Sequence, residues 1–117
     1  MSNKRVWGLW SAAVVLVIAS TANAASFDCR RAHAPDERVV CAKRDLNDQD
    51  VRVAVLYEST LHFMAMGARD AARERQRAWL AERRRCGSNE ACLRRVYEGR
   101  VQELQRLLEQ AYGLGPL

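Results

Sequence analysis

The chain has 117 residues, four of them cysteines, and a formal net charge of +5. That length allows one small domain and leaves no room for a second hydrophobic core. Arginine supplies most of the positive charge, but acidic residues are interleaved with it. This mixture is typical of solvated helix faces and argues against a nucleic-acid-binding surface.

The first 24 residues have the pattern of a secretory signal peptide. Lys4 and Arg5 form a basic start, and an almost wholly apolar run of about 14 residues follows them. That run is shorter than the roughly 20 residues that a membrane-spanning helix needs. The small residues of Ala22-Asn23-Ala24 suit a signal peptidase, so we expect cleavage between Ala24 and Ala25.

We therefore predict a mature protein of one domain, residues 25–117, located in the periplasm or outside the cell. Cleavage also removes the charges of Lys4 and Arg5 from the total of +5, which leaves about +3. The residues Ser26-Phe27-Asp28 before Cys29 do not form the small apolar box of a lipoprotein. Contact with a membrane is therefore expected only through the uncleaved signal.

The cysteines form an even set in a short exported chain, which is typical of a disulfide framework. A Cys-x-x-Cys redox motif is absent from the sequence. Zinc would need four ligands at tighter spacings, and neither His33 nor His62 has a matching ligand three or four residues away. We therefore expect no metal and no other cofactor.

From Asp45 onward the sequence has helical periodicity, and proline occurs only at positions 35 and 116. The pattern predicts a short helix over 35–44 and three long helices over 45–66, 68–86 and 90–112. Asp45 suits the N-cap of the second helix, and Gly67 suits its end. The predicted fold is an all-α bundle of three long helices and a short N-terminal one.

The sequence "CGSNEAC" predicts the turn of an αα-hairpin between the last two helices. Gly87 suits the left-handed position after a helix, and Ser88 or Asn89 suits the next N-cap. Cysteines at the two edges of such a turn lie close enough to bridge. Four cysteines allow three pairings, and we favour Cys29–Cys41 with Cys86–Cys92 because each joins the nearest partners in the chain.

The helix over 68–86 has a mixed inward face. At helical spacing this face carries Ala68, Ala72, Gln76, Trp79, Leu80 and Arg83. The opposite, wetter face carries Arg69, Arg73, Arg77 and Arg84. Trp79 is either a core residue that packs over Tyr97 and Leu93 or an exposed anchor for a partner. Gln76 and Arg83 either hydrogen-bond to Tyr97, Asp50 or helix ends, or contact a partner.

Several segments follow one another in an order typical of a known family. They are "SFDCRRA" (26–32), "ERVVCAKRDL" (37–46), "QDVRVAVLY" (49–57), "QRAWLAERRRC" (76–86) and "ACLRRVYEGRVQEL" (91–104). This order resembles the LprI-type lysozyme inhibitor family, in its N-terminal-domain form, over essentially the whole mature chain. The positions that carry the resemblance are Phe27, Asp28, Tyr57, Gln76, Trp79, Leu80, Arg83, Leu93 and Tyr97.

The resemblance implies an exported, helical, disulfide-bonded domain that binds and inhibits lysozyme. The founding type is lipid-anchored, whereas this chain has no lipoprotein box. Gln49 stands where the family pattern has leucine, which makes that helix more polar. Asp28, beside Cys29, is expected to cap or stabilise a turn.

The sequence indicates a binding protein and not an enzyme. Its glutamates are scattered among arginines, and no histidine is paired with a serine or free cysteine for nucleophilic work. The candidate contacts for a partner are Arg84, Arg85, Arg94 and Arg95. The alternatives for this cluster are a solubilising face and favourable charge at a helix C-terminus. The partner is expected to be lysozyme, another periplasmic protein or, alternatively, an anionic component of the envelope.

Overall fold

The structure, a computed structural model, describes residues 25–113. These residues form a short 3-10 helix and four α-helices, without any strand. The 3-10 helix η1 covers Cys29–Arg31, and the α-helices are α1 (Pro35–Ala42), α2 (Arg44–Phe63), α3 (Met66–Arg85) and α4 (Glu90–Tyr112). The predicted all-α fold, with three long helices after a short one, is confirmed.

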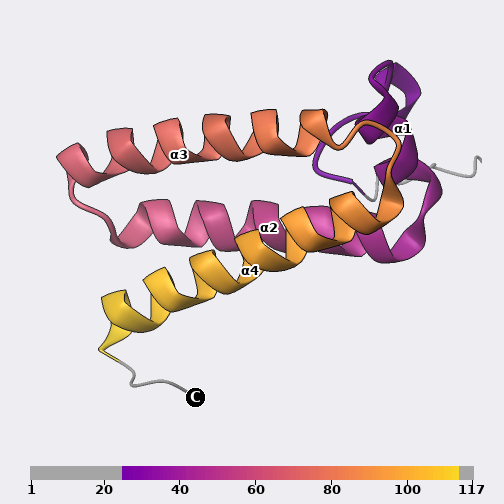
Figure 1. The fold of residues 1–117 in the computed structure, drawn as a ribbon. Coiled ribbons are helices and arrows are strands. Elements are labelled where there is room, and N and C mark those ends of the chain that lie inside the picture. The colour runs from indigo at the N-terminus through magenta and orange to yellow at the C-terminus, as the bar shows by residue number, and fades with distance from the viewer. Residues whose placement is uncertain (1–24, 114–117) are drawn as a thin grey trace, which may run out of the picture.

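Helix α4 packs mainly along α2, and α1 closes one end of the bundle (Figure 1). Helices α3 and α4 leave the turn at residues 86–89 as a hairpin and then diverge (Figure 1). The core lies between α1, α2 and α4 and is completed from α3 by Trp79. Its fully buried apolar side chains are Val40, Leu46, Val53, Trp79, Leu93, Tyr97 and Leu104.

Both predicted disulfides are present. Cys29–Cys41 joins the N-terminal segment to α1, and Cys86–Cys92 spans the α3–α4 turn. The Cα atoms of the two pairs are 5.7 and 5.5 Å apart, within the ordinary range for a disulfide. No cysteine is left free. Two disulfides are typical of an oxidising setting outside the cytoplasm.

The caps at the stapled turn agree with the sequence. Gly87 has a φ of +54°, a conformation that strains most other residues. Asn89 is the N-cap of α4, and its side-chain oxygen accepts the N–H of Cys92 at 2.9 Å. Asp28 caps η1 in the same way by accepting the N–H of Arg30.

Two helix boundaries were predicted wrongly. Lys43 has an extended backbone and separates α1 from α2, so that Asp45 lies inside the first turn of α2 instead of capping it. There its carboxylate pairs with Arg94. Gly67 does not end α2, because α2 stops at Phe63 and Gly67 lies in the first turn of α3.

Arg69 contributes to the joint between α2 and α3, contrary to its predicted place on the wetter face. Its Nε donates to the carbonyl oxygens of Leu61 and Met64 at 2.9 and 3.0 Å. These carbonyls belong to the C-terminal end of α2, where no further helical N–H groups are available. Ala68, predicted to face inward, is exposed.

Replacement of Asn89 with alanine removes the N-cap of α4. We expect the free energy of unfolding to fall by about 1 kcal/mol, measured by urea denaturation of the oxidised protein. Ser88→Ala is the matched control, because Ser88 is exposed and makes no cap hydrogen bond. Equal losses in the two variants would contradict the assignment of the cap.

Candidate functional site

A buried ion network joins α1, α2, α3 and α4 at the stapled end of the bundle. Arg83 is only 4% exposed, and its Nε donates to Asp36 Oδ2 at 2.8 Å. Its Nη1 lies 3.6 Å from Asp50 Oδ1, and its Nη2 lies 3.8 Å from Glu37 Oε1. One guanidinium therefore holds three carboxylates that come from two other helices.

Tyr97, on α4, is fully buried and connects Asp50 to Arg83 in this network. Its hydroxyl donates to Asp50 Oδ1 at 2.8 Å and accepts from Arg83 Nη1 at 3.4 Å. Burial, together with the negative charge of Asp50, raises the pKa of Tyr97, which keeps the hydroxyl a donor. Burial alone would lower the pKa of Arg83, but its contacts with Tyr97 and Asp36 outweigh that effect and raise it.

Aromatic side chains enclose the network. Phe27 stacks on the Arg83 guanidinium, 5.3 Å from ring centroid to Cζ. Trp79 meets Tyr97 edge-on at 5.2 Å between centroids, and its Nε1 donates to the carbonyl of Val96 at 3.2 Å. Trp79 is 2% exposed, so the core interpretation is correct for it.

The motif positions are thus structural in this chain. Leu93 is fully buried, while Tyr57 and Leu80 are half-buried against the same core. Gln76 bonds to neither Tyr97 nor Asp50. Its Oε1 accepts from Nε and Nη2 of Arg100 at 3.2 and 2.9 Å.

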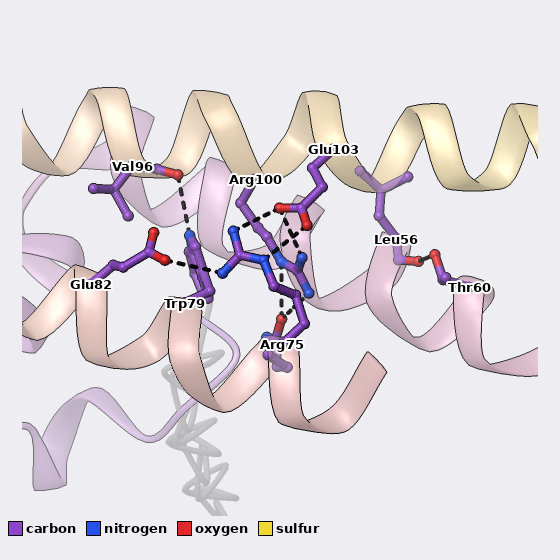
Figure 2. Close-up of polar contacts among 9 residues, drawn as sticks. Leu56, Thr60, Arg75, Trp79, Glu82, Val96, Arg100 and Glu103 are labelled. Atoms are coloured by element: carbon purple, nitrogen blue, oxygen red, sulfur yellow. Dashed lines mark hydrogen bonds and ion pairs between the residues drawn. The ribbon is translucent and has the colours of Figure 1, made fainter. Parts of the chain in front are cut away.

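A second polar network crosses from α3 to α4 (Figure 2). Arg75 makes a two-pronged contact with Glu103 at 2.9 and 3.0 Å and also donates to Glu82 at 3.1 Å. The buried Arg100 lies 3.0 Å from the same Glu103. Burial would raise the pKa of Glu103, but the hydrogen bonds from Arg75 and Arg100 lower it instead.

The four candidate arginines surround the stapled turn, and all are exposed. Arg94 is occupied, because it donates to Asp45 at 2.7 Å and to Glu90 at 3.2 Å. Within residues 25–113, no carboxylate lies within 4.0 Å of the guanidinium groups of Arg84, Arg85 or Arg95. We call these three residues the arginine cluster. The disulfide and the Asn89 cap hold the helix ends that carry it.

A groove of about 360 Å³ lies between α3 and α4, and Arg95 is the one member of the cluster that lines it. Arg95 and Arg106 lie along it on α4, and Trp79 forms part of its floor. Its two carboxylates, Glu82 and Glu103, are already bonded to Arg75. The open charges of the groove are therefore positive.

Two other hollows have different character. One, of about 260 Å³, lies between the far ends of α2, α3 and α4 and is lined mainly by Tyr57, Met64, alanines and leucines. Another, of about 410 Å³, lies between α2 and α4 and has mixed charges from Asp45, Arg52, Arg94 and Glu98. Neither brings together a nucleophile and a base.

Among residues 25–113, no helix combines the length and apolar character of a membrane span. The same part of the chain has no group of three or more His, Cys, Asp or Glu placed to hold a metal ion. His33 and His62 are both exposed. The predicted signal and its cleavage at Ala24 lie outside the described residues.

Comparison with known proteins decides neither the family nor the activity. No family model, curated protein or solved structure matches this chain. The function is therefore inferred from the geometry of the arginine cluster and the order of the sequence motifs.

Several residues of the two networks were missed from the sequence. Asp36, Arg75 and Arg100 were not identified as members of a buried network. A signal for Arg100 existed, because it lies three residues after Tyr97 and four before Leu104, inside the apolar seam of α4. A charged residue in such a seam predicts a buried partner.

Proposed function

We propose that the mature chain is an exported, non-catalytic binding protein and that the arginine cluster is its contact surface. The observation that carries this proposal is the exposure of Arg84, Arg85 and Arg95 without an acidic partner in the described chain. Exposed arginines elsewhere, such as Arg38 and Arg52, also have no carboxylate within 4.0 Å in residues 25–113, so the cluster is distinguished by its position on the helix ends that Cys86–Cys92 joins. Guanidinium groups that are free and held on stapled helix ends suit carboxylate or phosphate groups of a partner.

Lysozyme is the first partner to test, because the sequence motifs resemble those of the LprI-type inhibitors. Animal-type lysozymes are strongly basic, so a domain near +3 is repelled at long range. A short-range contact can still be favourable. An arginine inserted into the carboxylate-containing cleft would form a desolvated pair, and such pairs can be strongly coupled.

The test is a titration of lysozyme activity on cell walls with the oxidised mature protein, at low and moderate salt. We expect inhibition at micromolar concentration. The triple variant Arg84→Ser, Arg85→Ser and Arg95→Ser should weaken it at least about tenfold, since about 1.4 kcal/mol of lost binding corresponds to that factor. The matched control is Arg38→Ser, Arg44→Ser and Arg52→Ser, which removes the same charge from exposed positions outside the cluster and its groove.

The two triple variants separate specific contact from net charge. Equal effects of the two would show that only overall charge matters. Absence of inhibition by the parent protein at micromolar concentration would eliminate lysozyme as the partner.

A second function follows from the basic groove between α3 and α4. Arg95 and Arg106 give it open positive charge, which suits an anionic component of the envelope such as lipid headgroups or wall polymer. Each arginine near an anionic surface contributes about 1 kcal/mol, and salt screens that attraction. Salt-insensitive or absent binding to anionic vesicles would remove this alternative.

A further inference from the structure

The buried ion network has more negative than positive charge. Asp36 is 1% exposed and Asp50 is 2% exposed, and the carboxylate of Glu37 stands beside them. Arg83 is the one cation within 4.0 Å of these three groups in residues 25–113. The Glu37 side chain is 26% exposed, but Asp36 and Asp50 are both buried and share the single charge of Arg83. A second positive group beside them would therefore stabilise the network.

The start of the described chain lies against this network. The backbone N–H of Ser26 donates to Asp50 Oδ2 at 2.7 Å. Ala25 is itself buried, at 7% exposure. Because one residue spans at most about 3.6 Å, the nitrogen of Ala25 lies within about 6 Å of that same carboxylate oxygen.

The predicted cleavage adds a positive charge near the Asp50 carboxylate. Hydrolysis of the Ala24–Ala25 peptide bond consumes one water molecule; Ala24 leaves with the carboxylate, and Ala25 keeps the amine. An α-amine has an ordinary pKa of about 7.7–8.0, so it takes up a proton at neutral pH. The neutral amide nitrogen of Ala25, within about 6 Å of the Asp50 carboxylate, thus becomes an ammonium group.

We propose that the α-ammonium of Ala25, released by signal cleavage, binds at Asp50 and completes the buried ion network. Phe27, packed on Arg83, and the disulfide at Cys29 hold the intervening chain in place. Cleavage then stabilises the mature fold, and the uncleaved chain lacks this ion pair. The inference rests on the predicted cleavage position and is independent of the partner that the arginine cluster binds.

The experiment uses the full chain, exported with its own leader and purified after processing. Mass spectrometry identifies the N-terminus, which should be Ala25. A Gly-Ser pair inserted between Ala24 and Ala25 leaves the cleavage motif intact and moves the ammonium group by up to about 7 Å. The same insertion is made in an Asp50→Asn chain, which gives a double-mutant cycle.

We expect the insertion to lower the folding equilibrium constant at least about tenfold in the Asp50 chain and less than twofold in the Asp50→Asn chain, by urea denaturation. An equal effect in both, or none in the Asp50 chain, would overturn the proposal. So would an N-terminus other than Ala25.

Amine labelling gives a second readout that does not depend on the Asp50→Asn chain folding. After cleavage the only lysine of residues 25–117 is Lys43, whose side chain is 47% exposed and serves as the internal reference. We expect the α-amine of the folded parent to be labelled at least tenfold more slowly than in urea, relative to Lys43. The insertion should remove that protection. Equal labelling of the α-amine in the folded and unfolded parent would contradict the buried ion pair.

Discussion

Replacement of Arg83 with methionine should lower the free energy of unfolding by about 3–5 kcal/mol. Methionine fills part of the space but leaves Asp36 and Asp50 buried without the guanidinium that they share. It also removes the stacking partner of Phe27 and the donor to Tyr97. The loss is measured by urea denaturation of the oxidised protein with its disulfides intact.

The neighbouring Arg84→Met variant is the matched control. Arg84 is exposed, so the same substitution there should change the free energy of unfolding by no more than about 0.5 kcal/mol. Addition of Asp36→Asn to Arg83→Met should recover part of the loss, because it removes one of the unpaired buried charges. If Arg83→Met costs no more than Arg84→Met, the network is not a source of stability.

Removal of both disulfides should have an effect of similar size. The chain-entropy model gives about 3 kcal/mol for the Cys29–Cys41 loop and roughly 2 kcal/mol for the shorter Cys86–Cys92 loop. Their sum is comparable with the lower end of the stability of small domains, about 5–15 kcal/mol. We therefore expect the fully reduced protein to be largely unfolded at temperatures where the oxidised protein is folded.

Thermal unfolding followed by far-ultraviolet circular dichroism, with and without reductant, measures this loss. The variants Cys29→Ser with Cys41→Ser and Cys86→Ser with Cys92→Ser separate the two contributions, and the first pair should cost more. In a variant with all four cysteines replaced, reductant should have no effect. An unchanged melting temperature after complete reduction, verified by thiol counting, would contradict the role assigned to the disulfides.

The helices were predictable because local signals mark them. Apolar residues recur at helical spacing in α2 and α4, and the Gly87 and Asn89 caps flank a short stapled turn. The boundaries were less accurate. Lys43 ends α1 by taking an extended backbone, and a lysine side chain does not predict that conformation.

The polar interior was the part that sequence patterns missed. Helix α3 has few large apolar residues, so its inward face is built from Trp79 together with Arg75, Gln76 and Arg83. Arg83 meets Asp36 across 47 positions of the chain, and such a distant pair leaves no local periodicity. The ion pair between Arg94 and Asp45 was missed in the same way, whereas the other three candidate arginines have no ion partner in the described chain.

The central claim is that this is an exported domain whose disulfides close a small core around a buried ion network. Thiol trapping of the protein as it is isolated from cells, followed by non-reducing peptide mapping, tests that claim most directly. The account predicts a chain that begins at Ala25, no free thiol, and the two linkages Cys29–Cys41 and Cys86–Cys92. Four free thiols in material from the cytosol, or a crossed pairing, would contradict it.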